Sequence, residues 1–191
     1  MEEDVKDFVS ECAKVLKKGG TILYPTDTVW GIGCDATNQK AVDKIFKIKG
    51  RNQQKSFIIL LDDPEKIAQY ADDVSPIAYD FIKKYTRPLT IIYPNAKKLA
   101  KNVIASNGSI AIRVVREHFC EELIKTFGKP IVSTSANFSG YPAPATFSDI
   151  DSTIKEMVDY VVPFHQDSLN KINPSTIIQL FPNGTFRIIR D

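Results

Sequence analysis

The sequence predicts a mixed α/β fold, in which helices pack on a sheet that contains both parallel and antiparallel strands. Apolar segments of strand length alternate with amphipathic segments of helical spacing over the first two thirds of the chain. A hairpin around Pro182-Asn183-Gly184 closes the chain. The chain has 191 residues, of which 43% are hydrophobic, so it can bury a full core as a single domain spanning residues 1–191.

The helices are predicted from apolar residues that recur every three or four positions and from the residues that end each stretch. Residues 3–18 carry such a stripe and stop at Gly19-Gly20. Asn38 caps the next helix, which runs to about Lys49 and ends at Gly50. Further helices are expected at residues 64–70, 75–85, 117–127 and 149–159.

The strands are predicted from short apolar runs between turn-forming residues. They are expected at residues 21–25, 57–61, 89–93, 109–115, 130–134, 161–162, 175–181 and 185–190. The segment after the first strand contains threonines, an aspartate and glycines, and we interpret it as a polar, turning segment. Thr26, Asp27 and Thr28 stand at the carboxyl end of that strand, where open α/β sheets bind ligands, so a site is expected there.

The cysteines and the chain's opening exclude several classes of protein. Cys12, Cys34 and Cys120 are far apart, odd in number and without CxxC spacing, so neither a disulfide framework nor a zinc ribbon is indicated. The acidic first residues are unlike a cleavable signal, and no apolar run approaches the roughly 20 residues needed to cross a bilayer. We therefore expect a cytoplasmic protein with no membrane segment.

The net charge of +2 conceals two basic segments. Residues 40–55 contain six cations and one acid, and residues 81–101 contain six cations and no acid. If both segments folded onto one face, that face would attract a polyanion such as a nucleotide or RNA. Two solvated helix surfaces are the alternative.

Familiar catalytic and nucleotide signatures are missing from the sequence. No GxxxxGK[ST] occurs, and residues 31–36 match GxGxxA too far beyond the strand to form its turn, so we treat that match as accidental. His118 and His165 are the two histidines, and neither lies near a serine or cysteine in a recognisable nucleophile setting.

Three segments carry groups that suit a ligand. Lys49-Gly50-Arg51 places two cations at a helix end, although such cations also complement the helix dipole. The loop STSANFSG, residues 133–140, has four hydroxyls and an amide and leads into a proline-stiffened stretch, so it could hold donors around a ligand or be an ordinary surface loop. Arg113 interrupts an apolar strand, where a charge usually has a buried or ligand partner.

Together these segments resemble one family. In sequence order they read YPTDTVWGIG, KIKGRNQQKSFIILL, RPLTIIYP, SIAIRVV, KPIVSTSANFSG and NPSTII. Their order and spacing resemble the YrdC-like family, the threonylcarbamoyl-AMP synthases (TsaC type), over residues 18–190. The combination of KxR and SxN is specific to that family.

The resemblance implies a fold and a reaction. The fold is a YrdC-like twisted open sheet around a positively charged concave surface. The reaction condenses L-threonine, bicarbonate and ATP into threonylcarbamoyl-AMP and pyrophosphate, which makes the enzyme a nucleotidyltransferase. Mg²⁺ is expected with ATP, held mainly by substrate oxygens and water. A partner complex then transfers the threonylcarbamoyl group to tRNA, and direct binding of tRNA or double-stranded RNA stays open.

The resemblance also implies roles for individual residues. The residues expected to grip the nucleotide phosphates and support catalysis are Lys49, Arg51, Ser135 and Asn137, joined by Lys55. The residues expected to line the threonine and carbamate side are Thr26, Thr28, Arg113, Ser133 and Ser175, and those expected to border the nucleotide are Ser109 and Arg190.

The chain departs from the family pattern at a few positions. Asn52 and Ser56 stand where prolines are common, Arg87 replaces a glycine, and HQDSLNKIN replaces a glycine-rich stretch before Ser175. A paralogue that acts on another small carbamate therefore remains an alternative. The other alternative is an RNA-binding module that keeps the basic concavity but makes no adenylate.

Overall fold

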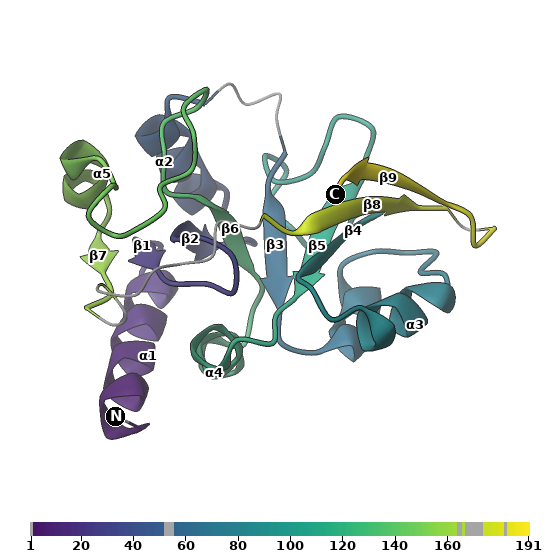
Figure 1. Ribbon diagram of the computed structural model, residues 1–191, viewed down its shortest axis with the longest axis horizontal. Coiled ribbons are helices and arrows are strands. Elements are labelled where there is room, and N and C mark those ends of the chain that lie inside the picture. Colours follow the sequence, from purple (N-terminus) through teal and green to yellow (C-terminus); the bar gives the residue numbers. More distant parts are fainter. Residues whose placement is uncertain (1, 52–55, 164–165, 167–173, 182) are drawn as a thin grey trace.

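The computed structural model describes residues 2–51, 56–163, 166, 174–181 and 183–191. Those residues form a sheet of nine strands in the order β7-β1-β2-β6-β3-β5-β4-β8-β9 (Figure 1). The strands are β1 (Thr21–Tyr24), β2 (Gly31–Asp35), β3 (Ile58–Leu61), β4 (Leu89–Tyr93), β5 (Ile110–Val114), β6 (Ile131–Ser135), β7 (Tyr160–Val161), β8 (Thr176–Leu180) and β9 (Phe186–Arg190). The helices are α1 (Glu2–Lys17), α2 (Gln39–Lys49), the 3-10 helix η1 (Pro64–Gln69), α3 (Ile77–Lys84), α4 (His118–Phe127) and α5 (Ser152–Met157).

The sheet is mixed, which confirms the predicted fold class. Parallel pairs are β1 with β7, β3 with β5 and β4 with β8, and the other neighbouring strands run antiparallel. Most predicted elements are present within one or two residues. The helix predicted at 149–159 is shorter because the Asp151 side chain caps it, accepting from the backbone N–H of Thr153.

The prediction of a turning segment after β1 was wrong for residues 31–35, which form β2 between β1 and β6. The glycines that argued against a strand are required by packing. A Cβ on Gly33 would lie 2.7 Å from the Tyr24 ring and 2.9 Å from the carbonyl oxygen of Val132. Because Gly31 and Gly33 pair within a sheet and not at a strand-to-helix turn, the GxGxxA match is accidental, as predicted.

Helix α2 begins and ends where the sequence predicted, and this matters because its C-terminus carries the KxR motif. The Asn38 side chain accepts hydrogen bonds from the backbone N–H groups of Lys40 and Ala41. Gly50 ends the helix in the left-handed conformation, with φ 55° and ψ 34°. The chain therefore reverses direction between Lys49 and Arg51.

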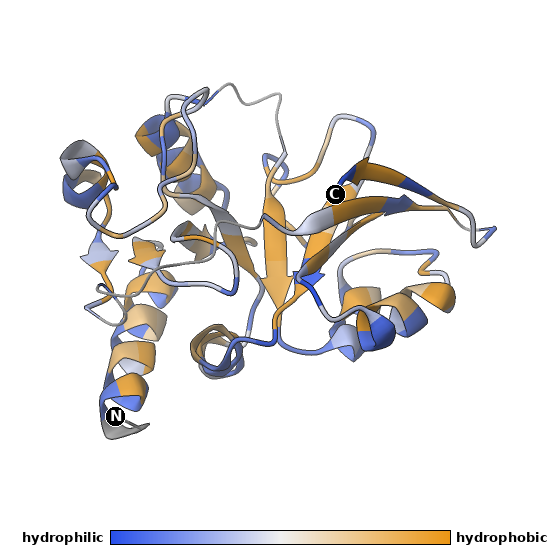
Figure 2. Ribbon diagram, in the orientation of Figure 1, coloured by the Kyte–Doolittle hydropathy of each residue, from blue (hydrophilic) through white to orange (hydrophobic). Residues whose placement is uncertain are grey.

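Helices cover the two faces of the sheet unequally. On one face α1 and α4 pack over Ile22, Leu60 and Ile131. On the other face a larger core joins α2, α5 and α3 to residues such as Ile59 and Ile112. Figure 2 shows hydrophobic colour along β3 and β5 and a hydrophilic outer side on the helices. The face under α1 and α4 is covered only near β1, β6 and β3, so its other half stays open for a site.

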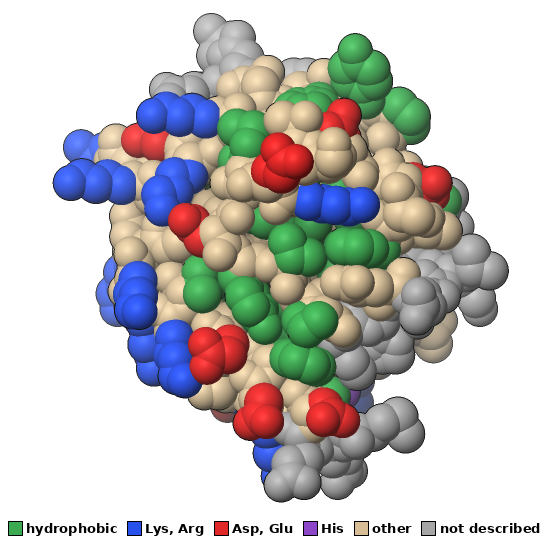
Figure 3. Space-filling model, turned by 90° about the vertical axis from the view of Figure 1, so that its left-hand side faces the viewer, with side chains coloured by type: hydrophobic (Ala, Val, Ile, Leu, Met, Phe, Trp, Pro, Cys, Tyr) green, Lys and Arg blue, Asp and Glu red, His purple; other side chains and the backbone are tan. Residues whose placement is uncertain are grey.

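The two basic segments come together only in part. Helices α2 and α3 lie toward opposite ends of the molecule in Figure 1. Residues after β4 nevertheless reach α2, because the side chain of Asn102 donates to the carbonyl oxygen of Gln39 at 3.0 Å. Figure 3 shows Lys and Arg side chains along one border of the side that carries α1, α2 and α5.

Among the described helices, none is long and apolar enough to span a membrane.

Candidate active site

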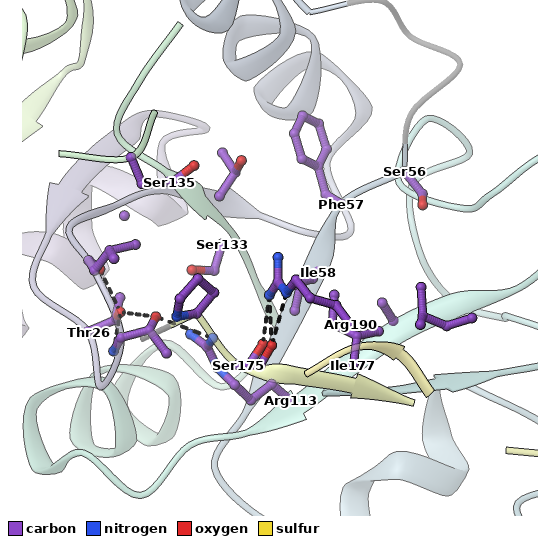
Figure 4. Close-up of a pocket in the computed structure, with 18 of the residues that line it drawn as sticks. Thr26, Ser56, Phe57, Ile58, Arg113, Ser133, Ser135, Ser175, Ile177 and Arg190 are labelled. Atoms are coloured by element: carbon purple, nitrogen blue, oxygen red, sulfur yellow. Dashed lines mark hydrogen bonds between the residues drawn. The ribbon is translucent and has the colours of Figure 1, made fainter. Parts of the chain in front are cut away.

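A cavity of about 390 Å³ occupies the open half of the face that α1 and α4 partly cover. Its walls come from the β1–β2 loop, the end of α2, the strands β3 to β6 and the C-terminal hairpin. In Figure 4, Thr26, Ser133 and Ser135 line one side of this cavity, and Ser56, Ile177 and Arg190 line the other. Segments far apart in the sequence therefore meet at this point.

The floor of the cavity is built by strand register. Ser133 of β6 lies opposite Ile58 of β3, which pairs with Ala111 of β5, which in turn pairs with Ile92 of β4. Residues two positions apart on a strand share a face, so Arg113 of β5 points to the same side as Ala111. An arginine within an apolar strand thus reaches the site because its apolar neighbours point the other way.

The β1–β2 loop forms a wall held by hydroxyl groups. Thr26 Oγ1 donates to the carbonyl oxygen of Val29 at 2.7 Å, and it accepts from the backbone N–H of Thr28 at 3.1 Å. The two threonine hydroxyls lie 3.0 Å apart. Since the Thr26 proton is used on Val29, the Thr28 hydroxyl donates to Thr26. This short network holds both predicted threonines at the cavity.

Arg113 is the most buried cation of the lining, with its side chain 5% exposed. Its Nη2 lies 3.2 Å from Asp27 Oδ1, and its Nη1 donates to Thr28 Oγ1 at 3.4 Å. Its Nε is buried and has no hydrogen-bond partner. Asp27, which the sequence placed near the expected site without giving it a role, balances this charge from outside the cavity lining.

Ser175 and Arg190 close the opposite wall. Arg190 donates to the Ser175 carbonyl oxygen from Nε at 3.1 Å and from Nη2 at 2.8 Å (Figure 4). The Ser175 hydroxyl lies 2.8 Å from that of Thr90, which is fully buried. Burial, and then the nearby Arg113, lower the pKa of Arg190. The end of β9 is thus hydrogen-bonded to the segment before β8, and the two residues contact each other although the sequence assigned them to different parts of the site.

Arg51 lies at the upper end of the cavity. Its Nη2 donates to the carbonyl oxygen of Ser56 at 2.8 Å, and its guanidinium stacks 4.7 Å from the centre of the Phe57 ring. Its Nε is buried without a hydrogen-bond partner. Burial lowers the pKa of Arg51. A guanidinium held in this way keeps donors available for a ligand.

The structure places most of the predicted residues in the cavity lining and separates the others from it. The lining contains Thr26, Thr28, Arg51, Arg113, Ser133, Ser135, Ser175 and Arg190. Lys49 is outside the lining and contacts the carbonyl oxygens of Ser135 and Asn137, whereas Asn137 lines a separate cavity with Phe138 and Tyr141. Ser109 lies in a separate small cavity with Asn107 and Phe181. Lys55, like Asn52, falls outside the described residues.

The apolar part of the lining was missed by the sequence analysis. It includes Val29, Ile58, Ile92, Ala111, Ala143, Pro174, Ile177 and Ile189. Period-two alternation around Arg113 would have found Ala111, but the others depend on how strands and loops far apart in the sequence are placed, so they could not be read from one segment.

A family model described as "Telomere recombination" (Sua5/YciO/YrdC) matches residues 14–191. The chain belongs to this family. A threonylcarbamoyl-AMP synthase of Pseudoalteromonas translucida is 34% identical over 175 residues, which cover 90% of this chain and 92% of that protein. These similarities confirm the resemblance read from the motifs.

Solved structures of this family have the same fold. Escherichia coli YciO superposes with a TM-score of 0.83 at 23% identity, over 96% of this chain and 88% of that chain. Sua5 of P. abyssi, crystallised with L-threonine, has a TM-score of 0.80 at 26% identity. That match covers 90% of this chain but 50% of the Sua5 chain.

In this member of the Sua5/YciO/YrdC family, the cavity is chemically suited to anions. Its described lining offers three guanidinium groups and several hydroxyls but no carboxylate. The described residues also contain no group of three or more His, Cys, Asp or Glu that could hold a metal ion. The lining can therefore bind phosphates and carboxylates directly.

Proposed function

We propose that this protein is a threonylcarbamoyl-AMP synthase, which uses ATP, L-threonine and bicarbonate. The observation that carries the proposal is the convergence of Arg51, Arg113 and Arg190 with hydroxyl-rich walls in one cavity. A relative named threonylcarbamoyl-AMP synthase, similar over nearly its whole length, supports the same activity. The L-threonine complex of Sua5 supports threonine as the amino acid substrate.

The reaction requires two anions to meet. The amine of threonine adds to carbon dioxide derived from bicarbonate, which forms a carbamate and releases a proton to solvent, and a carbamate oxygen then attacks the α-phosphorus of ATP. The new phosphorus–oxygen bond forms as the bond to the β-phosphate breaks, and pyrophosphate leaves with the electron pair. Fixed cations and hydroxyl donors reduce the repulsion between the reactants. Holding both reactants in position could contribute about 7–11 kcal/mol.

The geometry suggests how the chain divides this work. Arg51 and Ser135, at the α2 and β6 end of the cavity, are assigned to the phosphates. Arg113, which is held by its ion pair with Asp27 and its hydrogen bond to Thr28, is assigned to the carboxylate of threonine. Ser133 and Thr26 line the space between these two ends, while Ser175 and Arg190 border the opposite wall. The mechanism assigns no general base, since carbamate formation supplies the nucleophile.

Mg²⁺ is proposed to enter with ATP as part of the nucleotidyl transfer. It would neutralise phosphate charge and be held by phosphate oxygens and water. The absence of carboxylates from the described lining fits this mode of binding. The product, a reactive mixed anhydride, is proposed to pass in the cytoplasm to a partner complex that modifies tRNA.

The activity is tested by mixing protein, ATP, Mg²⁺ and bicarbonate with and without L-threonine and measuring pyrophosphate. The expected result is release that depends on threonine, needs no RNA and is strongly reduced in Ser135→Ala. Release that ignores threonine would contradict the proposal. If Ser135→Ala kept full activity while the unmutated protein bound tRNA tightly and salt-dependently, an RNA-binding module would be the better description.

A further inference from the structure

Lys49 and Arg51 belong to one motif but face different parts of the molecule. Gly50 adopts the left-handed conformation between them, and the N–H groups of Gly50 and Arg51 donate back to Lys47 and Phe46 at 3.1 and 3.0 Å. These hydrogen bonds fix the backbone conformation at the end of α2. Arg51 lines the cavity, whereas Lys49 is 3% exposed and is not part of the lining.

The buried ammonium of Lys49 contacts the loop that follows β6. Its Nζ donates to the carbonyl oxygens of Ser135 and Asn137, both at 2.6 Å. The backbone N–H of Ser139 donates back to the Lys49 carbonyl oxygen at 2.9 Å. The short distances from Nζ are typical of charge-assisted hydrogen bonds. The loop is thus attached to the end of α2 through both the side chain and the main chain of Lys49.

We propose that Lys49 is a positioning residue, whose ammonium holds the Ser135–Asn137 turn so that the Ser135 hydroxyl is presented to ligands in the cavity. It acts through Ser135 and makes no contact with ATP itself. The naming of ATP as the ligand rests on the proposed function. The position of the ammonium, directed at backbone carbonyls, differs from the phosphate-gripping role expected from the sequence.

The environment of Lys49 links this contact to pH. Burial, and secondarily the charge of Arg51, lower its pKa to about 7. Residues 135–141 of the facing loop include no acidic or basic side chain, and Lys47 on the same helix is exposed. A polyanion in the cavity favours the charged ammonium, so its binding should take up protons near pH 7. Affinity should fall as pH rises through that range, because the hydrogen bonds lose their charge assistance.

The first test measures binding of Mg²⁺-ATP without threonine, by calorimetry in buffers that differ in ionisation enthalpy. Lys49→Met keeps an unbranched chain as far as Cε but removes the ammonium and both of its hydrogen bonds, and Lys47→Met is the matched control on the exposed side of α2. We expect Lys49→Met to bind about 10-fold more weakly or worse and to lose the proton uptake, and Lys47→Met to match the unmutated protein. An unchanged affinity, or uptake that persists in Lys49→Met, would overturn the proposal.

A double-mutant cycle separates positioning from direct contact. If Lys49 acts through Ser135, then Lys49→Met should have little further effect in a Ser135→Ala background. Additive losses would show that Lys49 contacts the ligand independently, and the positioning role would be abandoned. Lys49→Gln, which keeps a neutral donor, should recover part of the affinity, and far-UV circular dichroism checks that each variant is folded.

A second readout needs no ligand. Trp30 is the single tryptophan, its carbonyl oxygen accepts from the Ala136 N–H at 2.9 Å, and its ring lies 4.8 Å from that of Phe147. Its fluorescence should change near pH 7 in the unmutated protein and stay flat in Lys49→Met. His118→Asn and His165→Asn exclude histidine titration as the cause. A transition that survives in Lys49→Met contradicts the proposal, whereas a Lys49-dependent transition in a protein that binds no ATP contradicts the proposed function alone.

Discussion

The two halves of one sheet face carry opposite chemistry. Near β1, β6 and β3 the face holds Ile22, Leu60 and Ile131 under α1 and α4. Further along the same face, Arg113 and Ser133 line a cavity. Leu60 and Arg113 are direct neighbours in the parallel pair of β3 and β5, so the change from core to site occurs within one step of the sheet.

A buried position on this sheet face is not always part of the hydrophobic core. Arg113 is 4% exposed and Leu60 is fully buried, yet only Leu60 is packed by helices. Arg113 is buried by the walls of a cavity and by its ion pair with Asp27. A substitution on the covered half should therefore reduce stability, whereas one on the open half should reduce ligand binding and turnover.

Arg113→Ala should have the largest effect on activity. Removing a fixed cation from the reacting centre is expected to reduce threonine-dependent pyrophosphate release by about 100- to 1000-fold. The substitution also leaves Asp27, whose side chain is 16% exposed, without its ion-pair partner, which costs about 1–3 kcal/mol of stability. Asp27→Asn in the same chain should restore part of that stability without restoring activity. If activity returned with stability, Arg113 would be structural and the two halves would not differ in function.

Leu60→Ala tests the half of the sheet face that α1 and α4 cover. Deleting a fully buried leucine should lower the free energy of unfolding by about 2–5 kcal/mol, measured by urea denaturation. The KM for threonine should stay unchanged because the side chain lies under α1 and α4. A raised KM with normal stability would mean that the cavity extends beneath those helices.

Arg51→Ala should have an intermediate effect. Loss of a charge-assisted hydrogen bond costs about 1.5–3 kcal/mol, which corresponds to about 10- to 100-fold in ATP use. The melting temperature should change little, since Arg51 makes only one hydrogen bond, to the Ser56 carbonyl oxygen, and one stacking contact, with the Phe57 ring. Steady-state kinetics of Arg51→Ala beside Lys47→Ala, which should be nearly silent, would check the assignment. Equal activities in the two variants would remove Arg51 from the site.

Ser109→Ala should have the smallest effect. The Ser109 hydroxyl donates to Asn107 Oδ1 at 2.7 Å, and the residue lies outside the large cavity. We expect activity within about twofold of the unmutated protein and a stability change within about 0.5 kcal/mol. A tenfold rise in the KM for ATP would instead show that Ser109 borders the nucleotide, as the sequence predicted, and that the site extends along β5.

Much of the sequence-based prediction rested on interactions between residues that are close in the sequence. The bounds of α2 follow from Asn38 and Gly50, because capping and left-handed termination involve residues close in sequence. The strands with apolar runs were likewise visible from composition. The loop predicted at residues 133–140 was wrong for Ser133, Thr134 and Ser135, which lie on β6 because they pair with β2. The resemblance carried by the motifs supplied the roles of residues that the cavity brings together, including Arg113 and Ser175.

Distant contacts decided the rest. Gly31 and Gly33 look like turn residues, but they lie in a strand that pairs with β1 and β6, and the Tyr24 ring fills the space that a side chain at Gly33 would take. The chain alone shows which groups are present: a KxR turn, an SxN motif and an arginine in an apolar strand. That Arg51 lines the cavity while Lys49 binds the loop follows from the fold, because the left-handed Gly50 separates the two side chains and the partners of Lys49 lie 86 and 88 residues away.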